Sequence, residues 1–315
     1  MRIRIRSAAS LLPAALALAT AVSCGSGGGP ARPSEYAASV PVPTMAPSVR
    51  VADPRTGVVG DVRLPLDAYT PTPDQKLVLD NARIALENSC IHRFGFSETI
   101  PPKKSPPSFL AHINAGLFGP TDVAVVKVHG YRVPDPGGGA GTSAQNPPQL
   151  SDAVVGLLTG TGPGRVHGMR VPAGGCVGEA LRALSKGGPA APNDTSYANN
   201  LAASLGDSVD KDPRVLEVQR RWSSCMKSQG YSYESSIQAM GDSRWQGRVP
   251  SRIEIDTALA DVECKRRVDL EDIGIAAWVA YENEQIKAHS AQLDTYLSWL
   301  RNALGNARSL ANGTA

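Results

Sequence analysis

Three neighbouring residues form the polar cluster that we consider first as a ligand contact. His129, Tyr131 and Arg132 stand in the string His-Gly-Tyr-Arg. An imidazole, a phenol and a guanidinium together can hold an anionic group. The alternative is a turn with Tyr131 in the core and Arg132 in solvent, which is the commoner position for such side chains. We name His129, Tyr131 and Arg132 as the candidate ligand contacts and keep both interpretations.

The motifs of common catalytic sites are missing from the sequence. It has no G-x-S-x-G pentapeptide for a serine nucleophile and no H-E-x-x-H for a catalytic zinc. Its five histidines never pair at the spacing of metal ligands. The glycine-rich stretch 160–165 lacks the G-K-[S/T] ending of a phosphate-binding loop. We predict no catalytic residue, no metal site and no cofactor, and we expect that the protein is not an enzyme.

The first 23 residues are predicted to be a lipoprotein signal peptide. Three arginines among the first six residues precede an apolar stretch from Ala8 to Val22, which is too short to span a bilayer. This stretch ends in Ala-Val-Ser directly before Cys24, a pattern that resembles a lipobox. The alternative is an ordinary signal peptide with an incidental cysteine. We expect Cys24 to carry the lipid, palmitate included, on the extracellular face of the cell membrane.

The remaining cysteines predict two structural disulfides. Cys90, Cys176, Cys225 and Cys264 are an even number, which suits an exported protein in an oxidising compartment. None of them belongs to a C-x-x-C motif, so a zinc knuckle or a thioredoxin-like site lacks its spacing.

A short repeat favours one pairing of these cysteines. The strings N-S-C-I-H-R-F-G-F and S-S-C-M-K-S-Q-G-Y each place a cysteine near a helix end, a glycine five residues later, and then an aromatic residue. Each string is followed by a further cysteine within a helical pattern. We therefore predict the disulfides Cys90–Cys176 and Cys225–Cys264, one in each of two related halves.

The elements that must position these residues are mainly α-helices. Thr72-Pro73-Asp74-Gln75 has the form of a capping box and predicts a helix that runs to about His92. Asp212-Pro213 predicts a second helix that stops at Gly230. After a flexible Gly/Pro/Ser-rich tether at 24–60, we expect a first helical half at 61–205 and a second at 206–315. The valine-rich segment 122–128 suits either a strand or a capped helix.

The pattern from Asp272 to Asn312 predicts one long C-terminal helix. Apolar residues recur there alternately three and four positions apart, as in a coiled-coil seam. The leucine-rich part of this seam, our candidate for a helix that docks on an envelope protein, is Leu293, Leu297, Leu300 and Leu304. The alternative is a helix that packs on its own domain, or one that folds against the helix around Cys264.

The net charge further narrows the range of partners. It is +3 for the whole chain, and three of the basic residues belong to the predicted signal peptide. The mature protein is therefore close to neutral, which argues against nucleic acid as a partner.

Several motifs together resemble a family of exported lipoproteins from high-GC Gram-positive, actinobacterial bacteria. The resemblance extends over about residues 62–312. The strings that carry it are Phe-Gly-Pro-Thr-Asp at 118–122, His-Gly-Tyr-Arg at 129–132, Gly-Cys-Val-Gly-Glu-Ala at 175–180, Trp-Ser-Ser-Cys-Met at 222–226 and Ala-Asp-Val-Glu-Cys-Lys at 260–265. The resemblance implies an envelope protein, working beside transporter or signalling components, and assigns no catalytic residue. In the family the stretch that matches 122–128 is usually helical.

These observations favour a membrane-anchored, non-catalytic interaction protein of the cell envelope. Two alternatives from other classes are kept. One is a solute-binding lipoprotein that feeds a transporter, a function usually carried by α/β lobes, whose strand–helix alternation is missing here. The other is an envelope enzyme with an unrecognised site.

Overall fold

The computed structural model describes residues 41–44, 62–104, 114, 117–132, 149–247 and 249–313. The predicted signal peptide at 1–23, Cys24 and most of the tether predicted at 24–60 lie outside these ranges. Within them the chain is mainly helical, as the sequence predicts, and its strands are limited to one short antiparallel pair. The elements are η2 (Pro65–Tyr69), α1 (Pro73–Arg93), α2 (Val123–His129), α3 (Asp152–Thr159), β1 (Arg165–Val166), β2 (Met169–Arg170), α4 (Gly175–Leu184), α5 (Tyr197–Ala203), α6 (Gly206–Asp210), α7 (Pro213–Ser228), α8 (Ser236–Met240), η4 (Ser243–Trp245), α9 (Arg252–Val268), α10 (Leu270–Ala288) and α11 (Ser290–Ala311).

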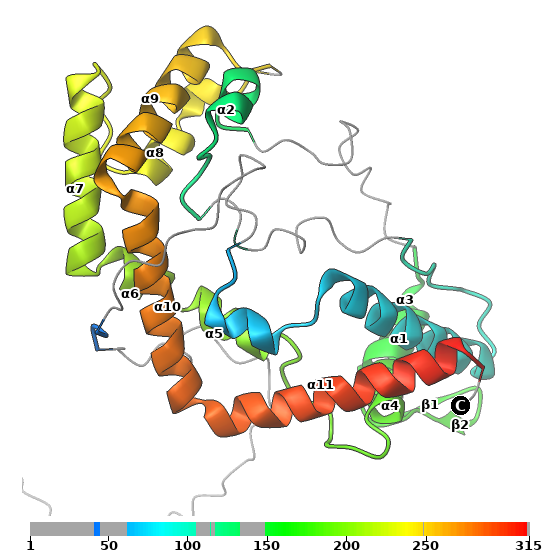
Figure 1. The fold of residues 1–315 in the computed structure, drawn as a ribbon. Helices are drawn as coiled ribbons and strands as arrows, with labels where there is room; N and C mark the ends of the chain where they lie inside the picture. The colour runs from blue at the N-terminus through cyan, green and yellow to red at the C-terminus, as the bar shows by residue number, and fades with distance from the viewer. Residues whose placement is uncertain are drawn as a thin grey trace, which may run out of the picture.

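The helices form two lobes that α10 joins (Figure 1). In one lobe α1 packs on α3, α4 and α11, and we call this the first lobe. In the second lobe α9 packs on α2, α7 and α8. The predicted halves, 61–205 and 206–315, do not coincide with these lobes. Helix α2 belongs to the first half but packs in the second lobe, and α11 belongs to the second half but packs in the first lobe.

The predicted helix starts at residues 72 and 212 are confirmed, because local capping chemistry decides them. The Thr72 hydroxyl accepts a hydrogen bond from the backbone N–H of Gln75, and the Gln75 side chain accepts one from the N–H of Thr72. Asp212 caps α7 through the N–H of Arg214 at 2.8 Å. In both helices a proline occupies the first turn, where its missing N–H costs nothing.

The segment that suited either a strand or a helix is helical. Asp122 caps α2 by accepting hydrogen bonds from the N–H groups of Ala124 and Val125. Val126 of this helix is fully buried in the core of the second lobe. The cap and the packing on α9 therefore outweigh the strand propensity of the valines.

The single long helix predicted for residues 272–312 is wrong, because the segment is two helices that meet at His289. The backbone there leaves the helical region, with φ −116° and ψ 19°, and α10 and α11 diverge sharply in Figure 1. The two helices pack on different partners: α10 lies against α7 and η2, whereas α11 lies against α1 and α4. The bend separates these two packing surfaces, although the three–four spacing of apolar residues continues across it.

Two disulfides brace the lobes, and they are the two pairs that the repeat predicts. Cys90 joins Cys176 between α1 and α4, and Cys225 joins Cys264 between α7 and α9. The Cα atoms are 5.7 Å apart in each pair. A disulfide typically stabilises a fold by about 2–4 kcal/mol because it restricts the unfolded chain.

The repeated strings end their helices in the same way. Gly95 and Gly230 both adopt positive φ, at 82° and 91°, where a residue without Cβ is favoured. The next residue in each case donates its N–H back to a carbonyl five positions earlier, which is the Schellman pattern of helix termination. This likeness is local, and a relation between the whole halves stays a proposal.

Candidate ligand-binding pocket

The predicted cluster around Tyr131 is organised by an internal carboxylate. Tyr131 is buried, and its ring stacks on Trp245 with the ring centroids 6.0 Å apart. The Arg132 guanidinium forms an ion pair with Glu254 at 3.3 Å and donates to the carbonyl of Trp245. The buried Glu254 already neutralises the positive charge of Arg132, so this charge is not free to bind an external anion. His129 lies half-buried at the end of α2, and the cluster forms a joint between α2 and α9.

Gly130 allows the end of α2 and helix α9 to approach closely at this joint. A Cβ atom built on Gly130 would lie 2.7 Å from Oε1 of Glu254, and the residue has a φ of 59°. Only glycine allows both the backbone conformation and the short approach. Tyr131 therefore lies in the core, as the alternative interpretation expects, but Arg132 is paired with Glu254 and is not left in solvent.

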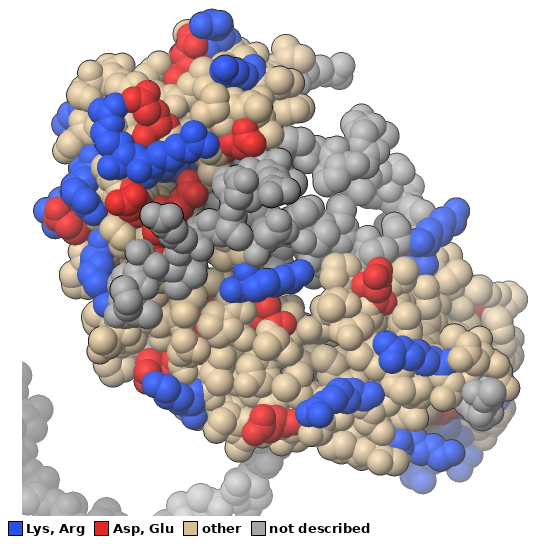
Figure 2. All heavy atoms as spheres, in the orientation of Figure 1, with Lys and Arg blue, Asp and Glu red and all other residues tan. Residues whose placement is uncertain are grey.

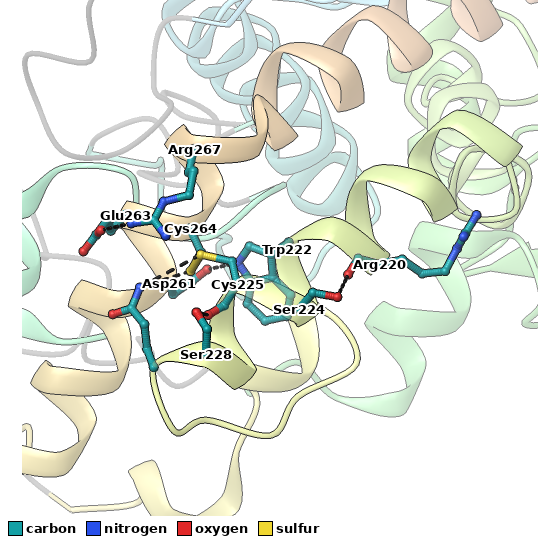
Figure 3. The surroundings of a disulfide bond; sticks show 10 residues. Arg220, Trp222, Ser224, Cys225, Ser228, Asp261, Glu263, Cys264 and Arg267 are labelled. Atoms are coloured by element: carbon teal, nitrogen blue, oxygen red, sulfur yellow. Dashed lines mark hydrogen bonds and ion pairs between the residues drawn. A yellow bond between two sulfur atoms is a disulfide. The ribbon is translucent and has the colours of Figure 1, made fainter.

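A buried ion pair beside the second disulfide is a feature that sequence reasoning missed. The Lys265 ammonium donates to Asp261 at 2.8 Å, and the Trp222 indole N–H donates to the other carboxylate oxygen at 2.9 Å. Figure 3 shows Asp261 and Trp222 meeting next to Cys225 and Cys264. Burial raises the pKa of the Asp261 carboxyl against the opposing effect of Lys265. The i, i+4 spacing of Asp and Lys was the available signal, but the same spacing is common on solvated helix faces.

A pocket with apolar walls lies in the first lobe, between α1, α4 and α11. Its volume is about 400 Å³. That value falls within the range of roughly 300–1,000 Å³ that small-molecule sites occupy. The apolar and aromatic side chains that line it include Leu79, Val177, Leu181, Leu184, Tyr296, Trp299 and Leu300. We take this space as the candidate functional site and call it the interhelical pocket.

Hydrogen bonds hold the two aromatic walls in place. The Tyr296 hydroxyl donates to the carbonyl of Thr195 at 2.9 Å, and the Trp299 indole N–H donates to the hydroxyl of Ser185 at 3.0 Å. Burial raises the pKa of Tyr296 to about 12, so its hydroxyl is not ionised at neutral pH. Because both polar groups are satisfied by the protein, the two rings offer mainly apolar surface to an occupant.

Charged side chains line one part of the pocket, which we call its mouth. Three basic residues and two acidic ones line it: Arg63, Lys76, Arg83, Asp67 and Asp80. Burial alone would raise the pKa of Asp80, but hydrogen bonds from Lys103 and Lys76 outweigh burial and hold that pKa below its ordinary value. Arg83 forms an ion pair with the buried Glu87. The acidic groups of the mouth are therefore already held by donors of the protein.

The candidate docking leucines of the C-terminal segment lie mostly inside the chain's own core. Leu293, Leu300 and Leu304 are buried, and Leu297 is half-buried. Leu300 also lines the interhelical pocket. The alternative that α11 packs on its own domain is therefore the arrangement in the structure. No part of the sequence reasoning pointed to the pocket, because its walls come from helices far apart in the chain.

The described ranges also bear on membrane crossing and on metal binding. Within those ranges, no helix has both the length and the hydropathy that a membrane crossing needs. No group of three or more His, Cys, Asp or Glu side chains in the described ranges is arranged to bind a metal ion. Positive and negative side chains are interspersed over the face drawn in Figure 2.

The fold and the pocket together define a disulfide-braced helical protein with an apolar space between its helices. Comparisons with known protein families, with curated proteins and with solved structures gave no match. The likeness to exported actinobacterial lipoproteins therefore rests on the sequence motifs alone.

Proposed function

We propose that the protein is a non-catalytic lipoprotein of the cell envelope that binds a small molecule with an apolar body. Cys24 anchors it on the extracellular face of the membrane. The interhelical pocket, with a volume of about 400 Å³ and walls of apolar and aromatic side chains, is the observation that supports binding. The anchor rests on the N-terminal sequence, where a short apolar stretch ends directly before Cys24.

The burial of α11 favours a small molecule over a docking helix as the occupant. Leu293 and Leu304 are covered by the chain's own helices, so the apolar face that would receive an envelope protein is already used. The pocket, in contrast, is lined by the half-buried Leu181 of α4, whose side chain is available to an occupant. This proposal combines two interpretations of the sequence, the non-catalytic envelope lipoprotein and the solute-binding lipoprotein. The binding domain is helical, in place of the α/β lobes usual for solute binding.

The test of binding uses a neutral probe, so that it does not depend on the charge of the ligand. N-phenyl-1-naphthylamine becomes fluorescent when it enters an apolar site. We expect saturable binding to the mature domain and a rise in its melting temperature, because a ligand that binds only the folded state stabilises it. Leu181→Trp fills the pocket and should abolish both signals, while Leu216→Trp, at an exposed position on α7, should leave them unchanged.

Two results would contradict the proposed pocket. One is the absence of saturable probe binding to the wild-type domain. The other is equal binding by Leu181→Trp and the wild type while both melt cooperatively, since the probe would then occupy another place.

A further inference from the structure

We propose that the interhelical pocket takes an amphipathic anion, with its apolar chain between α1, α4 and α11 and its anionic head group at Arg63 and Lys76. The inference rests on the proposed function, since it names the class of ligand for the same pocket. A carboxylate and a phosphate share the required chemistry, and a fatty acid or a single-chain lipid phosphate would supply it.

The balance of charge at the mouth favours an anion. The lining residues carry three positive and two negative charges. Lys103, bound to Asp80, and Glu87, bound to Arg83, carry opposite charges that cancel, so the excess rests on the lining residues themselves. An anionic head group at this place compensates that excess, whereas a cationic one adds to it.

Arg63 is the basic group at the mouth best able to receive the head group. Its side chain is exposed and forms no ion pair or hydrogen bond with any residue that the structure describes. A guanidinium presents paired N–H donors that match a carboxylate or a phosphate.

Lys76 supplies the second contact. It shares the Asp80 carboxylate with Lys103, so that two ammonium groups face one buried carboxylate. The Lys76 side chain is 39% exposed, so that it stays in contact with solvent. Because two lysines share one aspartate, one positive charge is not balanced there. An anionic head group beside Lys76 balances it.

The acidic groups of the mouth do not offer a matching site for a cation. The Asp67 carboxylate accepts hydrogen bonds from the N–H of Leu64 at 2.9 Å and from the Asn114 amide at 2.7 Å. Asp80 is held between its two lysines. A cationic head group would have to displace these internal donors, and an anionic one would not.

The experiment compares four probes that share one twelve-carbon chain: dodecanoate, dodecyl phosphate, dodecanol and dodecylammonium. Affinities for the mature domain are measured by isothermal titration calorimetry at pH 7.5 in low salt, at concentrations below those of micelle formation. We expect both anions to bind about tenfold more tightly than dodecanol, and dodecylammonium to bind more weakly than dodecanol. The preference for anions should fall as salt is added, because exposed charges are screened. Whichever of the two anions binds more tightly indicates a fatty acid or a lipid phosphate as the source.

Variants test the contacts of the head group separately from the binding of the apolar chain. Arg63→Ala should remove most of the preference for dodecanoate over dodecanol while the affinity for dodecanol stays unchanged. Arg252→Ala, at an exposed position on α9, is the matched control and should keep the preference. Lys76→Gln should reduce the preference in the same sense as Arg63→Ala.

The outcomes distinguish this inference from the proposed function. Equal binding of dodecanoate, dodecanol and dodecylammonium would overturn the anionic class and leave an apolar pocket in place. A preference for anions that survives both Arg63→Ala and Lys76→Gln would place the head group elsewhere and also overturn the inference. If neither the dodecyl probes nor N-phenyl-1-naphthylamine binds, the pocket itself is not a binding site and both proposals fail.

Discussion

Replacement of Glu282 by glutamine should make the protein more stable at pH 8 and leave its stability at pH 5 almost unchanged. Glu282 is buried on α10 and accepts a hydrogen bond from the backbone N–H of Leu66 at 2.8 Å, which fixes η2 to α10. Burial raises the pKa of this carboxyl to about 7, against an ordinary value of 4.5, although the bond from Leu66 acts in the opposite direction. A glutamine keeps an acceptor oxygen at the same place and has no proton to lose.

The size and the direction of the effect follow from this pKa. A raised pKa means that the folded protein binds the proton more tightly than the unfolded chain does. The stabilisation is therefore complete below about pH 4.5 and is lost as the pH rises through about 7. A difference of this size corresponds to about 3 kcal/mol at most. Wild-type protein should lose most of that amount between pH 5 and pH 8 through Glu282, and Glu282→Gln should not.

Urea unfolding followed by tryptophan fluorescence at pH 5, 6, 7 and 8 measures the free energy of unfolding for each form. Glu284→Gln is the matched control, because this neighbouring carboxylate is half-exposed and pairs with Lys287. The control should follow the wild-type curve. Glu271, whose pKa burial also raises to about 7, should contribute a further decline with the same sign, so Glu282→Gln alone should not give a flat curve. Parallel curves for wild type and Glu282→Gln from pH 5 to pH 8 would refute the reasoning about Glu282.

Three further predictions concern the anchor, the thiols and the C-terminal core. Cys24→Ser should abolish labelling by a palmitate analogue and release the protein from the membrane fraction into the medium; retention of label on the variant would contradict lipidation at this residue. Intact mass after alkylation without reductant should show no alkyl group on the domain, since both cysteine pairs are disulfides, and a single added group would be enough to refute this. Leu300→Ala should cost about 2–5 kcal/mol of stability, because Leu300 is buried in the core of the first lobe, whereas Leu297→Ala at its half-buried position should cost clearly less. Equal losses for the two leucines in urea unfolding would show that the burial of α11 is not as described.

The features that could be predicted from the sequence are those set by a few neighbouring residues. The capping box at Thr72 and the cap at Asp212 act over three positions, so their side chains alone determine where α1 and α7 begin. The disulfide pairing followed from a repeat that also ends both helices with a glycine at positive φ. Helix content and the two disulfides therefore needed no knowledge of tertiary packing.

The features that could not be predicted depend on contacts between distant segments. The three–four spacing continues across His289, and only the separate packing of α10 and α11 shows that the chain bends there. The pocket requires Leu79, Leu181 and Trp299 from three helices, which no pattern along the chain places together. The polar cluster around Tyr131 suggested a site because the sequence does not reveal that Glu254 lies beside it.

The placement of α11 has a consequence for how the protein must be made. The bond from Trp299 to Ser185 joins residues 114 positions apart, and helices α7, α8 and α9 of the second lobe are synthesised between them. Helices α1 and α4 therefore emerge long before the wall that covers them, with Leu184 of α4 still uncovered. Such late closure slows folding and exposes apolar surface in the meantime. A defect confined to the second lobe should therefore also delay completion of the pocket, although none of the altered residues would touch it.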